Sequence, residues 1–439
     1  MRTTAATTSW RWAHADASGW NAKRTGLSPW DATATSCASL RPRNLAAAAL
    51  VAALALVAGW NAYSYPSGAG YDVRQHREYA DLLIHHGEIP GPGSRSEYYT
   101  PPLFYALAGA ATVVGEHVHA GDPHKLGQVL NWIVLLAAAI VLWLLVRELF
   151  PERPWLQLSA LAFFCSLPVV LRVGAMFHPE PLSMLLSAVA LLLATRMLGR
   201  ADHRWQLAVA TGVVLGLGQL VRAFSLWTFA AVVLAFAVAR AWRPLVLVVA
   251  ATAVITAPWY IRQSIRYGDP VFDRPTKHEA IWDRRPARFY VGLGLPEVFS
   301  APIRPHFVNE AVPTTYSEIW GDYFGVWRGS RERQAFLGLL PTLLAVAGWL
   351  FLLARSWRIP ARLPAVLLPG LGLLGYLYFT VSYPTPDGDV LKASYMLTTA
   401  PTWALAFGYA VDRLPGRWRI AAAAVLAASA LASLPFLLY

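Results

Sequence analysis

The sequence predicts an all-α membrane protein with many transmembrane helices. Of its 439 residues, 56% are hydrophobic and only 14% are charged, whereas ordinary soluble domains are about 25% charged. The length alone would suggest about three soluble domains, but so few charges could not cover their surfaces. The same composition excludes a disordered chain and a coiled coil. With only two cysteines, it also excludes a secreted disulfide scaffold.

Apolar runs of suitable length follow one another along the chain. A helix rises about 1.5 Å per residue across a membrane core about 30 Å thick, so a span needs roughly 20 apolar residues. The runs lie at 44–65, 128–146, 155–173, 179–195, 205–220, 224–239, 244–261, 335–354, 363–383, 396–411 and 418–438. We therefore expect about 11 transmembrane helices, with a range of roughly 10 to 13. Gly212-x-x-x-Gly216 in one of these runs predicts close helix packing.

The division of the chain follows from the same pattern. Residues 1–43 show no helical periodicity, and we expect a disordered cytoplasmic tail. Residues 44–439 are expected to form one transmembrane domain. A cleaved signal peptide would need an unusually long segment before the apolar run, so we favour an uncleaved anchor.

A further apolar run, 101–119, is shorter, opens with two prolines and ends near Glu116 and His119. Lysine and arginine gather in cytoplasmic loops. If this run does not cross the membrane, the short arginine-rich loops 147–153, 196–204, 240–243, 355–362 and 413–419 all fall on the cytoplasmic side. We therefore expect a juxtamembrane or re-entrant helix, an N-terminus in the cytoplasm and a C-terminus outside.

This topology places most carboxylates and nearly all histidines on the outer face. The long loops 66–127 and 262–334 lie there, together with the turns 178–180 and 384–392. Loops held over a helical bundle are where sites tend to lie, so the active face is expected to be extracytoplasmic. The net charge of +12 then reports topology, and we expect membrane lipids rather than nucleic acid as partners.

Common catalytic motifs are absent from the sequence. It contains no GxxxxGK[ST], no GxGxxG after a strand, no HExxH, no GxSxG and no paired CxxC. ATP-driven transport, metalloprotease chemistry and serine hydrolysis by those signatures are therefore unsupported.

Asp72 is the first candidate catalytic residue. It follows the first span and precedes an amphipathic segment that contains Arg74 and Arg77. A carboxylate at the membrane boundary among arginines can stay ionised and accept a proton from a substrate hydroxyl. The alternative is a solvated, salt-bridged surface helix, and the spacing alone favours that alternative.

Glu180 is the second candidate, at the outer start of an apolar run. Carboxylates at such positions are costly and often functional. A helix N-terminal acid, with Pro181 in the first turn, is an equally good interpretation. His178 beside it is either a ligand or a polar cap, and the cap is favoured. Nothing in the spacing requires a metal, although His178 and Glu180 could form a weak site for a divalent cation.

Several short stretches, in the same order, carry a family resemblance. They are Asp72 with YA at 79–80 and HGEIP at 86–90, YTPPLFY at 99–105, Glu180 leading a span, PWYIR at 258–262 with YGDP at 267–270, and the weaker KASY at 392–395 with Pro401. Together they resemble the GT-C class of integral-membrane glycosyltransferases, especially bacterial relatives of protein O-mannosyltransferases and of the aminoarabinose transferase that modifies lipid A. The resemblance covers roughly residues 44–411.

The chain departs from that family at three places. Relatives often carry a glutamate where this chain has Tyr99, and Glu97 stands two positions earlier. The family's asparagine after Arg262 is Gln263, and its late arginine is Ser394.

The resemblance implies transfer of a sugar from a polyprenyl phosphate to a hydroxyl of a lipid, glycan or protein. The reaction would occur on the extracytoplasmic face of a bacterial inner (plasma) membrane, by a single inverting displacement. Asp72 would be the general base, and Glu180 would complete the acidic site. The donor phosphate and sugar would contact Arg74, Arg77, Glu97, Tyr99, Arg262, Lys392 and Tyr395. No cofactor would be required beyond an optional divalent cation.

A transporter or flippase for a lipid-linked sugar or another lipid is the alternative function. Transporters commonly show internal repeats and charged or broken helices near span centres. The apolar runs here are almost free of central charge, which favours the enzyme. A non-catalytic membrane scaffold is a third alternative, against which the carboxylates in family-like places argue.

Overall fold

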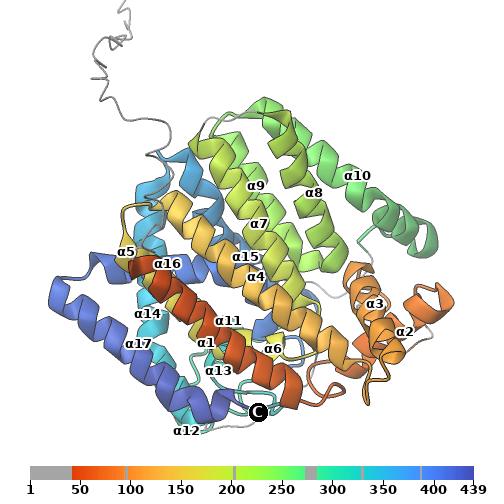
Figure 1. The fold of residues 1–439 in the computed structure, drawn as a ribbon, viewed down its shortest axis with the longest axis horizontal. Helices are drawn as coiled ribbons and strands as arrows, with labels where there is room; N and C mark the ends of the chain where they lie inside the picture. The colour runs from red at the N-terminus through yellow and green to blue at the C-terminus, as the bar shows by residue number, and fades with distance from the viewer. Residues whose placement is uncertain are drawn as a thin grey trace, which may run out of the picture. The chain divides into compact units, whose positions relative to one another are not determined.

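The computed structural model describes residues 42–92, 94, 97–200, 204–271, 284–327, 331–385 and 388–439. Within those residues, every regular element is a helix (Figure 1). The expected tail, residues 1–43, lies outside the described residues except for its last two, which begin the first helix.

The helices follow the predicted runs closely. The long ones are α1 (Pro42–Ser64), α4 (Lys125–Leu149), α7 (Glu180–Gly199), α10 (Trp242–Tyr267), α14 (Arg331–Ser356), α15 (Leu363–Ser382) and α17 (Gly416–Leu437). Between them lie α2 (Val73–His86), α3 (Leu103–His117), α5 (Pro154–Ser166), α6 (Pro168–Gly174), α8 (Trp205–Val221), α9 (Leu226–Val238), α11 (Ala287–Val291), α12 (Glu297–Ser300), α13 (Ala311–Trp320) and α16 (Ala400–Arg413). Short 3-10 turns are η1 (Ala223–Ser225), η3 (Pro360–Arg362) and η4 (Ala393–Thr399).

The chain is an all-α polytopic membrane protein. In the described part, 7 helices are long and apolar enough to cross a membrane, and the bent pair α5 and α6 would raise this to 8. The remaining predicted runs form the shorter helices α8 and α9 and the pair η4 and α16. The pair α5 and α6 bends by 55° where Pro168 removes a backbone N–H and prevents a straight helix.

The ambiguous run 101–119 forms α3, which is not among the helices that reach spanning length and hydropathy. It packs against α2 and α4. The segment between α1 and α4 thus holds two short helices, α2 and α3.

Glycines bring several helices into close contact. A Cβ on Gly212 would lie 2.5 Å from the Val248 carbonyl oxygen of α10, so the predicted small-residue face is confirmed. A Cβ on Gly348 of α14 would come even closer to the Ala406 carbonyl oxygen of α16. Lipid tails are as apolar as these helices, so close van der Waals packing, rather than hydrophobic burial, drives their association.

The arginine-rich loops meet at one end of the bundle. Glu148 lies 2.7 Å from Arg200 and Arg153 lies 3.4 Å from Asp412, and Arg43 at the start of α1 donates to the Pro151 carbonyl at 3.0 Å. The other end of α1 contacts the C-terminus, where the Tyr439 amide donates to Asn61 at 3.1 Å. In Figure 1, α6, α11, α12 and α13 lie toward that same C-terminal end. The loops around Glu148, Arg200 and Asp412 therefore lie at the opposite end of α1 from the C-terminus.

Candidate functional site

Asp72 is held in a turn between α1 and α2, directly before the first residue of α2. Its backbone is left-handed, with φ 50° and ψ 18°, a region that aspartate enters more readily than most side chains. Its Oδ2 atom lies 2.7 Å from Nζ of Lys392, which is 4% exposed and also lies 3.4 Å from Asp389. The fold thus joins the turn between α1 and α2 to the turn before η4, 320 residues later.

The two charges fix each other's protonation. Burial raises the pKa of the Asp72 carboxyl, but the ammonium and hydrogen bond of Lys392 lower it by more, so its pKa lies well below the usual range. Burial lowers the pKa of Lys392, yet the surrounding Tyr395, Asp72 and Asp389 leave it raised. The pair is therefore carboxylate and ammonium at neutral pH.

A second buried cluster surrounds Glu180 at the start of α7. Its carboxylate contacts the His178 ring and lies 2.8 Å from the Arg222 guanidinium. All three residues are buried. The edge of the His178 ring meets the His76 ring at a centroid distance of 4.7 Å. Glu180 is thus an acid paired with a guanidinium, rather than a solvated helix cap.

Tyr395 connects the two clusters. Its ring lies 5.6 Å from the Arg222 guanidinium. Its hydroxyl lies close enough to Lys392 to raise the pKa of that ammonium. The Phe224 ring, next to that of Tyr395, lies 5.3 Å from the same guanidinium. Two cations therefore lie close to one buried tyrosine.

A cavity of about 360 Å³ opens beside these charges. Its polar wall includes Glu97, Tyr99, Arg222, Asp389 and Tyr395, and its apolar wall includes Phe224, Leu226, Trp259, Val271 and Phe379. Leu226 is 49% exposed and Val271 64% exposed, so the apolar wall reaches the outer surface of the bundle. Asp72 and Glu180 do not line the cavity. Glu180 contacts Arg222, which does line it. Asp72 contacts Lys392, which in turn contacts Asp389 of the polar wall.

The candidate arginines are distributed unevenly around this site. Arg262 lies 5.4 Å from the ring of Trp259, a residue of the cavity wall, and donates to Gln263 at 2.9 Å. Arg77 donates to Ser67 at 3.0 Å and lies 2.8 Å from His124, while Arg74 is exposed.

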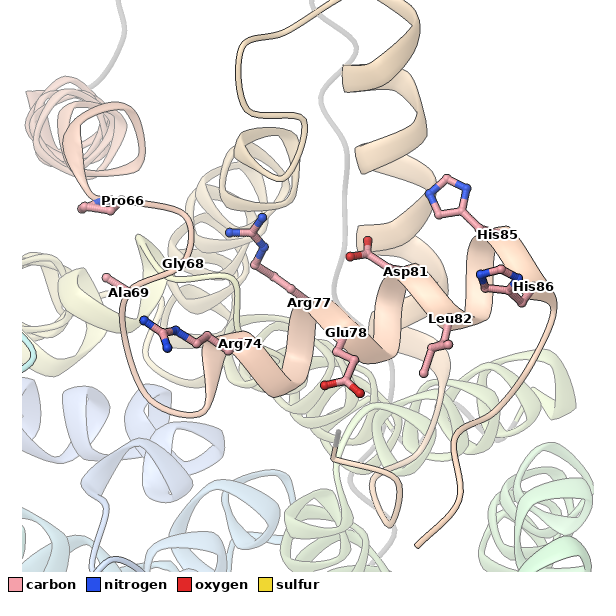
Figure 2. Close-up of a pocket in the computed structure, with 10 residues that line it drawn as sticks. All are labelled: Pro66, Gly68, Ala69, Arg74, Arg77, Glu78, Asp81, Leu82, His85 and His86. Carbon is pink, nitrogen blue, oxygen red and sulfur yellow. The ribbon is translucent and has the colours of Figure 1, made fainter. Parts of the chain in front are cut away.

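Arg74 and Arg77 line a separate, open hollow of about 750 Å³. Figure 2 shows Arg77, Asp81 and His85 along one edge of α2. The same helix buries His76 and Tyr79, because residues three and four apart share a helix face. The structure therefore does not bring Arg74 and Arg77 to the cavity.

Two arginines were missed as site residues. Arg222 and Arg172 each stand at the end of an apolar run in the sequence, and a charge at such a place needs a buried partner. That signal could have found both. Glu318, the partner of Arg172 at 3.0 Å, lies on the short helix α13 outside the apolar runs, and its sequence carries no comparable signal.

The described residues contain no group of three or more His, Cys, Asp or Glu side chains arranged to hold a metal ion. The Glu180 carboxylate contacts the Arg222 guanidinium and the His178 imidazole.

The fold and the site together define a class of protein. It is a polytopic, all-α membrane protein in which short helices and loops cover a buried cluster of charges at one end of the bundle. No family model matches the chain, and no curated protein matches it.

Solved structures show which proteins share this fold. ArnT from Cupriavidus metallidurans bound to undecaprenyl phosphate aligns with a TM-score of 0.55 and 19% identity, over 88% of this chain and 64% of that one. Archaeal oligosaccharyltransferase AglB from Archaeoglobus fulgidus, in complex with an inhibitory peptide and a dolichol-phosphate, aligns with a TM-score of 0.54 and 14% identity, over 89% and 55%. The chain thus spans less than two thirds of either relative's length, and the likeness concerns the fold.

Proposed function

We propose that this protein is a glycosyltransferase that takes a sugar from a polyprenyl phosphate and transfers it to an acceptor hydroxyl on the extracytoplasmic face of the membrane. One observation carries the proposal. The polar wall of the cavity includes the Arg222 guanidinium, and its apolar wall reaches the surface of the helices. A polyprenyl phosphate has two matching parts: an anionic head that a guanidinium can bind and a long apolar tail that the apolar wall can contact. ArnT and AglB, which share the fold, bind undecaprenyl phosphate and a dolichol-phosphate.

Arg222 is suited to the phosphate. Its Nε atom is buried and has no hydrogen-bond partner among the described residues, whereas its Nη2 atom is held by Glu180 at 2.8 Å. A guanidinium binds phosphate oxygens through several N–H groups at once. Glu180 thus orients the arginine, and a phosphate oxygen would satisfy the remaining donor.

The reaction would be one inverting displacement. The acceptor hydroxyl gives its proton to the Asp72 carboxylate while its oxygen bonds to the anomeric carbon. The bond from that carbon to the phosphate oxygen breaks, and the polyprenyl phosphate leaves as an anion. Arg222 and Lys392 stabilise its charge, so the leaving group needs no proton donor.

Lys392 would couple donor binding to base strength. Lys392 neutralises Asp72 across 2.7 Å and keeps the carboxylate a weak base. A donor phosphate competes for the same ammonium and adds a negative charge nearby. Both effects raise the proton affinity of Asp72. The base would thus become effective when the donor is in place.

Binding and transfer can be measured separately. We expect full-length protein in detergent to bind undecaprenyl phosphate, but not undecaprenol, by native mass spectrometry. Arg222→Met should weaken this binding at least about tenfold, because one charge-assisted contact is worth about 1.5–3 kcal/mol. Arg74→Met is the matched control, since Arg74 is exposed and away from the cavity, and it should bind like the wild type.

Transfer is tested in proteoliposomes given undecaprenyl phosphate linked to radiolabelled hexoses and pentoses, one at a time. Membranes of a gene-deletion strain supply the acceptor. Label in the acceptor fraction, with equimolar release of undecaprenyl phosphate, would support the proposal. Movement of intact donor across the bilayer without bond cleavage would instead establish the transporter alternative.

A further inference from the structure

A buried ion pair lies behind the proposed base, and the mechanism above does not use it. Glu318 of α13, which is 0% exposed, lies 3.0 Å from Nη2 of Arg172, which is 2% exposed. The Tyr71 hydroxyl donates to the same Glu318 oxygen, and the Arg172 guanidinium also donates to the Glu318 carbonyl. Burying two charges costs about as much as their attraction returns. Stability alone therefore gives little reason for this pair.

The pair is attached to the chain at the residue before Asp72. Tyr71 is 4% exposed, and its hydroxyl reaches a helix 247 residues away. On the other side of Asp72, Val73 is 1% exposed. The left-handed turn of Asp72 is therefore anchored on both flanks, and only its own side chain, at 28% exposed, is open to a substrate.

The Tyr71 ring also lies beside the partner of the base. Its centroid is 6.0 Å from Nζ of Lys392. A shift of Tyr71 would thus move Asp72 through the backbone and disturb Lys392 through the ring. The hydroxyl bond to Glu318 is the contact that resists such a shift.

We propose that Glu318 and Arg172 are positioning residues, which act through the Tyr71 hydroxyl to hold the Asp72 carboxylate at the acceptor oxygen. This inference rests on the proposed function and extends it to a second set of residues. A misplacement of about 1 Å at a reacting group can cost about 100-fold in rate. The pair would therefore be needed for turnover and not for donor binding.

Tyr71→Phe is the sharpest test, because it removes the tether and keeps the ring beside Lys392. Using the labelled donor that the wild type turns over fastest, we expect kcat to fall about 10- to 100-fold. KM for that donor and the affinity for undecaprenyl phosphate should stay within about twofold, since Tyr71 does not line the cavity.

Tyr316→Phe is the matched control. Tyr316 lies on the same helix as Glu318, and its hydroxyl donates to the Ala335 carbonyl without contact to Asp72. It should lose a comparable amount of thermal stability and keep the wild-type kcat. An equal fall of kcat in Tyr71→Phe and Tyr316→Phe would show that the contacts of α13 serve only the stability of the fold. That result would overturn the inference.

Glu318→Gln supplies a second measurement. The amide cannot neutralise Arg172, so the tether should loosen and kcat should fall as in Tyr71→Phe. The double variant should be no slower than the slower single variant, because both act through one contact. Full additivity, or wild-type kcat in Tyr71→Phe, would refute the positioning role. If the wild type itself transfers no sugar, the proposed function fails instead.

Discussion

At the scale of single residues, the site depends on which cation faces which carboxylate. Asp72 faces Lys392 at 2.7 Å and Glu180 faces Arg222 at 2.8 Å. The two pairs differ in exposure, since Asp72 is 28% exposed and Glu180 is 2% exposed. In the proposed reaction, Asp72 is therefore the carboxylate that meets the acceptor, and Glu180 is the partner of Arg222.

Asp72→Asn should remove the base and leave the shape of the site unchanged. General base catalysis contributes about 10²- to 10⁴-fold, so we expect kcat for labelled donor to fall within that range. Undecaprenyl phosphate should still bind, and more tightly if anything, because Lys392 loses its competing carboxylate. Turnover at the wild-type rate in this variant would exclude Asp72 as the base.

Lys392→Met should reveal the titration of Asp72. In the wild type the pKa of Asp72 is held well below its usual range, so the base is ionised and kcat/KM has no acid limb from it between about pH 5 and 8. Without the ammonium, burial remains and raises that pKa. Although His76 and His178 still lower this pKa, activity should then fall as pH falls, beginning at a higher pH than in the wild type.

The control for this pH profile is Lys125→Met. Lys125 donates to the Tyr63 carbonyl at 2.8 Å at the end of α1 and does not contact Asp72. Its profile should keep the wild-type shape. A Lys392→Met profile of wild-type shape would contradict the assigned coupling.

At the scale of helices, close packing places the site residues. The break between α5 and α6 turns Arg172 toward α13, and the end of α8 brings Arg222 to the start of α7. These bends follow from Pro168 and from the end of an apolar run at Arg222, both visible in the sequence. The partners of Arg172 and Arg222 could not be predicted from the sequence of either segment by itself.

Gly348→Ala should destabilise the bundle. Its Cβ would overlap the Ala406 carbonyl of α16, and overpacking costs typically about 1–3 kcal/mol. We expect a lower unfolding temperature in detergent. Gly416→Ala is the matched control, because nothing lies within 4 Å of a Cβ there. It should be neutral or slightly stabilising, and equal losses in both variants would contradict the packing argument.

At the scale of the whole molecule, two groups of loops lie at opposite ends of α1. Arg43 and Asn61 on this one helix contact the two groups separately, through Pro151 and Tyr439. The side of the membrane on which each end lies is a prediction from the arginine distribution.

Single cysteines should report that sidedness. In a background without Cys37 and Cys165, Arg358→Cys should react with a membrane-impermeant maleimide only after the cytoplasmic face is exposed. Gly121→Cys, in the first outer loop, should react in intact cells. The reverse pattern would invert the topology and move the proposed chemistry to the cytoplasmic face.

The sequence was sufficient for several features because they are local. The apolar runs, the juxtamembrane pair and the glycine face on α8 follow from hydropathy and spacing within short segments. Family-like motifs also pointed to Asp72, Lys392 and Tyr395, which the structure brings together. Arg74 and Arg77 were candidates because they stand next to Asp72 in the sequence, and they line a different hollow. Nearness in sequence does not show which face of a helix a side chain occupies.

The sequence by itself thus determined a helical membrane protein whose scarce carboxylates gather at the end opposite its arginine-rich loops. Only the tertiary structure decided the partners of those carboxylates. Lys392 meets Asp72 across 320 residues, and Glu318 meets Tyr71 across 247. Such pairings depend on how the helices pack and bend against one another, which no single segment specifies. The burial that follows from this packing keeps the paired charges in low-dielectric surroundings, where their interactions are strongest.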